Sequence, residues 1–249
     1  MVKHAPLQLS GSLAFPCSLA PRRVAWMAAV FLGASVAGTL AAPPKEPGGA
    51  AIAGLVQVID GDTIDIDGTR IRLEGIDAPE ASQACQSAKG EPWPCGRRAT
   101  AELRALIEGG TAECHERGHD KYGRVLAICM SGGKNINEFM VRRGYAWAFV
   151  KYSTEFASVE TEARQAKIGV WQGDAQAPWD FRHKEWAVAE TAAPTGCAIK
   201  GNISDRGHIY HVPWGAWYDK VRIDEAHGER WFCSEDDAIA AGWRAAVAN

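Results

Sequence analysis

Four charged residues in the segment 57–83 have the types and spacing needed to act on a phosphate ester. Asp62 follows an Asp-Gly turn, and Arg72 lies on the polar face of a predicted strand. Asp77 and Glu80 come just after that strand, in GIDAPE. Carboxylates at adjacent strand ends can share a hard cation such as calcium, and a guanidinium beside it can bind a phosphate oxygen through two hydrogen bonds. These groups together favour attack on a phosphodiester. The competing interpretation is that they are turn residues and solvated strand faces.

A predicted three-strand meander positions these charges. Its strands cover 55–59, 63–66 and 69–74, and Asp-Gly pairs separate them. Two further strands are predicted at 111–116 and 125–130, and helices at 96–107, 135–143 and 156–167. Five strands and about three helices, with the meander first, favour a small antiparallel barrel of the α+β class over a parallel sheet.

Composition divides the chain of 249 residues into five segments. Linkers are expected where Pro, Gly and Ala gather. The final segment has its own cysteine pair and a predicted helix at 235–246, so we expect a separate α+β module. The segments are a signal peptide or anchor at 1–41, a linker at 42–53, the barrel domain at 54–186, a linker at 187–195 and the C-terminal module at 196–249.

The N-terminus has the parts of a secretory signal. Arg22 and Arg23 precede an uncharged run at 24–42, which ends in small residues around Ala41. We expect cleavage after Ala41; the alternative is that the run stays as a membrane anchor. In both cases the remainder is predicted to be periplasmic or secreted.

Six cysteines follow the predicted signal, and an even number in an exported chain indicates disulfides. Pairing of nearest neighbours gives three local bridges and is favoured over the other pairings. A zinc site is the rival interpretation, but no Cys-x-x-Cys or His-x-x-x-His spacing is present. The predicted bridges are Cys85–Cys95, Cys114–Cys129 and Cys197–Cys233.

The charge balance argues against a broad basic surface for nucleic acid. Residues 1–41 hold three of the 27 bases and no acid, so 42–249 carry 24 bases against 30 acids. Any phosphate chemistry is therefore confined to a local site, where we expect a metal cation to assist.

Five motifs, in order, resemble the staphylococcal nuclease (thermonuclease) family over roughly 55–186. They are VIDGDT, RLEGIDAPE, DKYGR, NEFMVRRGYA and KIGVW. The resemblance implies an OB-fold, a five-stranded Greek-key barrel with three helices. It also implies a calcium-dependent nuclease that acts on DNA, RNA or both, as an endonuclease that leaves 3′-phosphates. No obligate protein partner is implied.

The resemblance also implies a role for each site residue. Glu80 would be the general base, and the two arginines would bind the scissile phosphate. Ala78 would ligate calcium through its carbonyl, so its side chain need not match that of the best-known member. The implied metal ligands are Asp62, Asp77 and Ala78, the catalytic residues are Arg72, Glu80 and Arg124, and the substrate contacts are Lys121 and Tyr122.

Three departures from the best-known member accompany the resemblance. The loop after Glu80 carries two cysteines, the domain is acidic, and the aromatic pair that packs on the nucleotide has no clean match, which leaves Phe149 and Tyr152 as candidates. The main alternative function is a non-catalytic module that binds nucleic acid or the cell envelope. A third interpretation is an envelope-tethered scaffold whose working part is the tail. The presence of all the catalytic residue types favours the enzyme.

The segment 196–249 resembles a small module called the sunset domain, which implies no function for it. His208 and His211 could bind metal with the two nearby cysteines, but a Cys197–Cys233 bridge explains the same residues. Four tryptophans could line a ligand groove, but a unit of this size needs large side chains in its core. They are Trp214, Trp217, Trp231 and Trp243.

Overall fold

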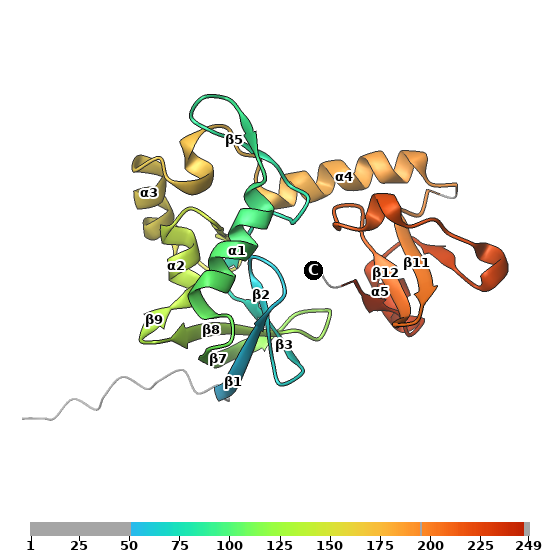
Figure 1. Cartoon of the computed structure of the whole chain (residues 1–249), viewed down its shortest axis with the longest axis horizontal. Helices are drawn as coiled ribbons and strands as arrows, with labels where there is room; N and C mark the ends of the chain where they lie inside the picture. The colour runs from blue at the N-terminus through green and yellow to red at the C-terminus, as the bar shows by residue number, and fades with distance from the viewer. Residues whose placement is uncertain (1–50, 195, 247–249) are drawn as a thin grey trace, which may run out of the picture. The chain divides into compact units, whose positions relative to one another are not determined.

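The computed structural model describes residues 51–194 and 196–246 (Figure 1). The predicted signal or anchor at 1–41 lies outside the described residues. Within the described ranges, no helix has both the length and the apolar character needed to cross a bilayer.

A closed barrel of five strands forms the first part of the fold. The strand order is β3-β2-β1-β7-β8, and the pairing of β3 with β8 closes the barrel. That closing pair is parallel and the others are antiparallel, so the barrel is mixed rather than antiparallel as predicted. The OB-fold prediction is confirmed. The barrel strands are β1 (Ala51–Val58), β2 (Thr63–Ile66), β3 (Thr69–Leu73), β7 (Thr111–His119) and β8 (Val125–Ser131).

Alternation of apolar and polar residues builds the meander. Ile64 and Ile71 point into the barrel and are fully buried, and they face each other in the β2–β3 register. The connecting turn places Asp67 at φ 51° and Gly68 at φ 85°, which explains the Asp-Gly pair there. β1 begins at Ala51, so the last residues of the predicted linker 42–53 belong to the barrel.

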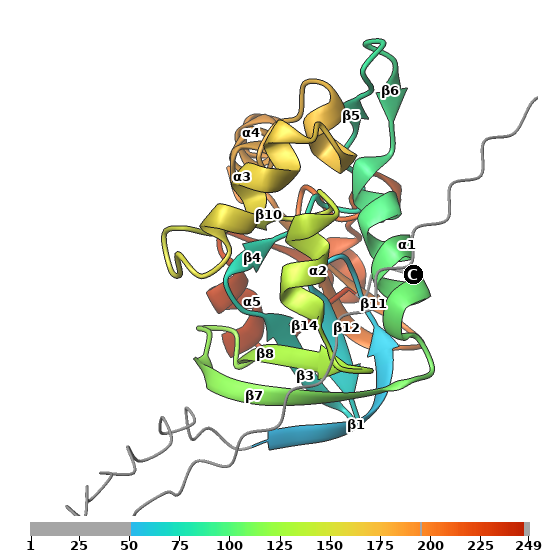
Figure 2. The same ribbon diagram turned by 90° about the vertical axis from the view of Figure 1, so that its left-hand side faces the viewer.

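Three helices follow from the predicted periodicity. α1 packs on β1 and α2 on β8 (Figure 2). The buried face of α1 carries Ala99, Leu103 and Ile107, at helical spacing. α2 is capped by Asn135, whose side chain accepts a hydrogen bond from the backbone N–H of Glu138. The helices are α1 (Cys95–Ile107), α2 (Ile136–Arg142) and α3 (Ala157–Gln165), and a 3-10 turn covers Gly169–Gln172.

Short strands connect these elements. One antiparallel pair joins β4 to β10 and another joins β5 to β6, while β9 extends the barrel sheet beside β8. The β4–β10 pair sets Asp77 opposite Trp147. The bounds are β4 (Ile76–Asp77), β5 (Cys85–Gln86), β6 (Pro92–Trp93), β9 (Lys134–Asn135) and β10 (Trp147–Ala148).

A fourth helix, α4 (Pro178–Ala192), covers most of the segment 187–195 that was predicted to be a linker. Pro178 starts it, and Ala187, Ala189 and Glu190 are strong helix formers. The alanine-rich composition that suggested a linker therefore continues a helix, and the side chain of Ala189 is buried.

The C-terminal module is built on a four-stranded sheet with the order β13-β11-β12-β14. Its helix α5 (Glu235–Ala240) is shorter than the predicted 235–246, because Gly242 at φ 81° ends it and the next residues pair with β12. Trp243 is buried among the core residues, but Trp217 is 39% exposed, so the prediction of a tryptophan core holds for only part of the set. The strands are β11 (Ile199–Ser204), β12 (Gly207–His211), β13 (Arg230–Phe232) and β14 (Arg244–Ala245), with 3-10 turns at Tyr218–Lys220 and Glu225–His227.

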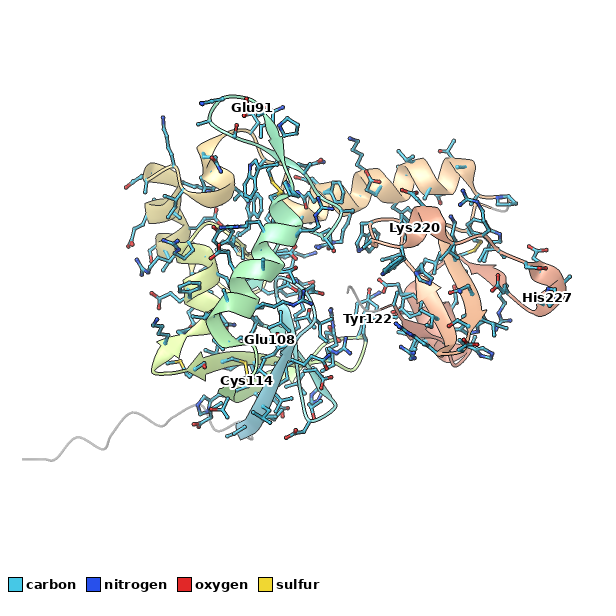
Figure 3. All side chains as sticks on the ribbon, in the orientation of Figure 1. Glu91, Glu108, Cys114, Tyr122, Lys220 and His227 are labelled. Atoms are coloured by element: carbon cyan, nitrogen blue, oxygen red, sulfur yellow. A yellow bond between two sulfur atoms is a disulfide. The ribbon has the colours of Figure 1, made fainter. Side chains whose placement is uncertain are left out.

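All three predicted disulfides are present. Cys85–Cys95 closes the loop before α1, Cys114–Cys129 joins paired residues of the neighbouring strands β7 and β8, and Cys197–Cys233 lies in the C-terminal module. Figure 3 labels Cys114 on its strand. The third bridge takes up both sulfurs that the alternative metal site needed.

Candidate active site

Arg72 joins the two aspartates that the motifs singled out. Its Nη1 donates to Asp62 Oδ1 at 2.7 Å and its Nη2 to Asp77 Oδ1 at 2.8 Å. Asp77 is fully buried and Asp62 nearly so. Burial alone would raise the pKa of Asp62, but Arg72 and the Ala78 N–H hold that pKa below its ordinary value. The segment therefore forms a real charge cluster rather than a set of solvated turn residues.

The strand register explains why these three residues meet. Thr63 faces Arg72 in the β2–β3 pair, so Asp62, one residue earlier, reaches the end of β3. Ala78 closes the cluster from the other side, because its N–H donates to Asp62 Oδ2 at 2.9 Å. Two residues separate β3 from β4, a distance that brings Asp77 back to Arg72.

Glu80 lies beside this cluster on the loop that leads to α1. Its backbone N–H donates to Gln83 Oε1 at 3.2 Å, and its Oε1 accepts from Arg182 Nη1 at 2.7 Å. Burial raises the pKa of Glu80 to about 8, although Arg182 opposes that rise. Gln83 is itself buried and donates to the carbonyl of Gln176 at 2.7 Å, which fixes the loop.

Arg124 reaches the same face of the barrel through the parallel β3–β8 pair. Arg72 is in register with Leu126, and Arg124 lies two residues before Leu126, immediately before β8 begins. Its Nε donates to Asp120 Oδ2 at 2.6 Å, and its charge helps to lower the pKa of Asp62. Barrel closure thus joins residues that lie far apart in the sequence.

Lys121 and Tyr122 lie in the loop between β7 and β8, and Figure 3 labels Tyr122 there. Both side chains have acidic partners on α5. The Tyr122 hydroxyl donates to Glu235 Oε1 at 3.0 Å, and Lys121 Nζ is 3.5 Å from Asp236 Oδ2. These predicted phosphate contacts are therefore paired with carboxylates in this structure.

A cavity of about 1260 Å³ opens over the cluster. It is lined by most of the predicted site residues and by two charged residues outside the predicted set, the acid Asp60 and the base Arg182. Burial and the nearby Asp62 raise the pKa of Asp60 to about 6. The predicted residues on the cavity wall are Asp62, Arg72, Ala78, Glu80, Lys121, Tyr122 and Arg124.

Both aromatic candidates for nucleotide packing lie at the same cavity. Phe149 and Tyr152 pack edge to face, with ring centroids 4.9 Å apart. Phe149 also stacks on Trp179 of α4, at 5.4 Å and an interplanar angle of 16°. Tyr152 is 69% exposed and so presents a ring to the solvent, as base stacking would require.

The carboxylates of the cluster now contact cations of the chain itself. Three of the four oxygens of Asp62 and Asp77 accept from a guanidinium, and the fourth accepts from Ala78 N–H. Accordingly, across 51–194 and 196–246 no three His, Cys, Asp or Glu side chains are arranged to hold a metal ion.

Comparison with known proteins identifies the barrel domain. Residues 70–173 match the family described as staphylococcal nuclease homologue. An uncharacterized endonuclease of Escherichia coli is 37% identical over 139 residues, which cover 53% of this chain and 84% of that protein. A micrococcal nuclease of Shigella flexneri is 35% identical over 146 residues, which cover 51% of this chain and 78% of that protein. A succinoglycan biosynthesis protein, ExoI, of Rhizobium meliloti strain 1021 is 33% identical over 131 residues, which cover 50% of this chain and 67% of that protein. The chain belongs to the staphylococcal nuclease family, and its relatives support a nuclease.

Proposed function

We propose that this protein is an exported, calcium-dependent nuclease that hydrolyses phosphodiester bonds of DNA, RNA or both. The observation that carries the proposal is the cluster at the cavity, where Arg72 bridges Asp62 and Asp77 next to Glu80. A buried carboxylate pair, a guanidinium and a carboxylate with a raised pKa are the groups that phosphodiester hydrolysis uses.

The donor set suits a hard divalent cation in its chemistry. Asp62 and Asp77 offer carboxylate oxygens and Ala78 offers a backbone carbonyl, and hard cations such as calcium prefer oxygen ligands. These three residues would hold the ion. When bound, calcium would supply positive charge to a phosphate oxygen and so stabilise the developing negative charge.

The chain's own residues would carry the proton and the phosphate. Glu80 accepts the proton of a water molecule, and burial raises its pKa above that of an ordinary carboxyl group, which makes its carboxylate a stronger base. Arg72 and Arg124 bind the phosphate oxygens as charge builds on them. The water oxygen bonds to phosphorus as the P–O5′ bond breaks, and the leaving 5′-oxygen takes up a proton, so the products are a 3′-phosphate and a 5′-hydroxyl. Lys121 and Tyr122 bind a neighbouring phosphate once their partners on α5 release them.

Three disulfides support the exported location. Such bonds persist in oxidising compartments and are rare where thiols are kept reduced. We propose that the N-terminal segment directs the chain to the periplasm or the medium.

The test is degradation of single-stranded DNA and of RNA by the purified mature chain, with calcium and then with a chelator. Glu80→Gln, Arg72→Lys and Arg124→Lys are each expected to lower kcat by about 100-fold or more, because a proton acceptor or a bidentate phosphate contact is lost. Arg70→Lys is the matched control, since Arg70 is two residues from Arg72 on β3 and its partner is Asp65 of β2, outside the cluster.

Two results would contradict the proposal. Cleavage that continues after calcium is removed would exclude the metal role. Wild-type rates in Glu80→Gln would exclude the proposed base. Mass spectrometry of the products checks the remaining point, because 3′-phosphate ends are expected and 5′-phosphate ends would place the broken bond on the other side of phosphorus.

A further inference from the structure

Arg182 is a cation at the candidate active site that lies outside the family match at 70–173. It is on the second turn of α4. Its Nη2 donates to Asp77 Oδ2 at 2.7 Å, and its Nη1 donates to Glu80 Oε1 at 2.7 Å and to Asp77 Oδ1 at 3.1 Å. One guanidinium therefore joins an implied metal ligand to the implied general base.

The start of α4 is anchored in a way that fixes this guanidinium. Trp179 stacks on Phe149 and packs against a buried cluster that includes the Cys85–Cys95 bridge. Just before the helix, the carbonyl of Gln176 accepts the hydrogen bond from Gln83. The contacts of Trp179 and Gln176 thus hold the start of α4, and with it Arg182, in one position. An arginine on a freely exposed surface would instead form only weak and transient ion pairs.

The charges of the cluster explain what Arg182 does there. Asp77 is fully buried, and a buried carboxylate needs a counter-charge and filled hydrogen-bond positions. Arg72 fills one of its two oxygens, and Arg182 fills the other and shares the first. A divalent cation on Asp77 would have to approach the oxygens that the Arg182 guanidinium already occupies, and the two positive charges would repel each other.

We propose that Arg182 is a positioning residue that acts as an internal cation, holding Glu80 against Asp77 and competing with a divalent cation for Asp77. This inference rests on the proposed calcium site. It follows that the chain binds calcium more weakly than its carboxylates alone would allow. It also follows that the metal-free protein is stabilised by Arg182, which supplies the charge that the ion would otherwise bring.

The experiment is a calorimetric titration of the full mature chain with Ca²⁺, without substrate. Arg182→Gln removes the charge and is expected to lower the Kd for Ca²⁺ by about tenfold or more. Arg182→Lys keeps the charge but loses the planar fork, so an intermediate Kd is expected. Lys184→Gln is the matched control, since it removes one positive charge from an exposed position on the same helix, and its Kd should equal that of the wild type.

Thermal unfolding gives a second readout. In chelator, Arg182→Gln should melt below the wild type, and excess Ca²⁺ should raise its Tm more than it raises the wild-type Tm. A Kd for Arg182→Gln that is equal to or weaker than the wild-type Kd would overturn the competition. If the variant does not fold, the side-chain NMR signal of Arg182 in the wild type decides: a shift on titration with Ca²⁺ supports the proposal, and an unmoved signal overturns it.

Parallel nuclease assays separate this inference from the proposed function. A wild type that binds Ca²⁺ and cleaves DNA, with an unshifted Kd in Arg182→Gln, would overturn the inference alone. A wild type that neither binds Ca²⁺ nor cleaves would overturn both.

Discussion

Arg72 has two roles at the scale of single residues, and they need separate measurements. It is a proposed phosphate ligand, and it is also the counter-charge of the two buried aspartates. Arg124 has a different setting, because its partner is the loop residue Asp120 and its side chain is more exposed. Two arginines with the same proposed catalytic role should therefore differ in what their loss does to the fold.

We expect Arg72→Gln to lower the free energy of unfolding by ~3 kcal/mol, because it leaves buried carboxylates short of a counter-charge. Arg124→Gln should cost about 1 kcal/mol or less, as for a partly exposed pair. Urea denaturation in chelator measures both. Equal losses in the two variants would mean that Arg72 does not support the buried aspartates.

Local sequence pattern could predict only some of these residues. Asp62 comes just before β2, Arg72 is on β3 and Asp77 is on β4, so short connections bring the three together. The position of Arg124 depends on the β3–β8 closure, and the motif order indicated it only through the family resemblance. Arg182 could not be predicted, because it is 102 residues from Glu80 and reaches it through the packing of α4.

At the scale of elements, the N-terminus of α1 supports the loop that carries Glu80. Gly96, the second residue of α1, lies against the backbone of that loop. A Cβ atom at this position would lie 1.6 Å from the carbonyl oxygen of Glu80, so any side chain would displace the backbone. The Cys85–Cys95 bridge closes the same loop and ends one residue before Gly96.

Gly96→Ala is expected to lower kcat by about tenfold to 100-fold, because a shift of about 1 Å in a catalytic group can cost that much. The strain should also lower the free energy of unfolding by about 1–3 kcal/mol. Steady-state kinetics and urea denaturation measure the two effects. The control is Gly110→Ala beyond the other end of α1, where the nearest atom would be 3.3 Å from the new Cβ. Wild-type kcat in Gly96→Ala would show that Glu80 tolerates the displacement.

Sequence pattern predicted some of the helices and not others. α1, α2 and α3 were predicted within two residues at each end, because apolar spacing and the glycines that follow each helix agreed. No part of α4 was predicted as a helix, and its second half was predicted as a linker, because an alanine-rich composition suits both. The end of α5 was missed because Gly242 interrupts an otherwise helical run.

At the scale of the whole molecule, the C-terminal module has its own core and its own buried titratable group. His211 on β12 is 8% exposed, and its Nε2 lies 2.8 Å from Asn202 Oδ1 of β11. Burial, with Lys200 as the second cause, holds the pKa of His211 below its ordinary value. The predicted likeness of this module to the sunset domain stays a prediction.

This histidine makes the stability of the module depend on pH. The folded module favours neutral His211, whereas the unfolded chain takes up the proton near the ordinary pKa of about 6.5. Stability from this group is therefore complete above about pH 6.5 and is lost as the pH falls toward the lower folded pKa.

Urea unfolding of the full chain, followed by the amide NMR signals of β11 and β12, should show a lower midpoint at pH 5.5 than at pH 7.5. His211→Gln keeps a side-chain N–H that can donate to Asn202 but removes the titrating ring, so the unfolding midpoint should depend less on pH. His227→Gln should not reduce this dependence, because His227 is exposed and paired with Asp224. The same pH dependence in wild type and His211→Gln would mean that another group controls the acid sensitivity of these strands.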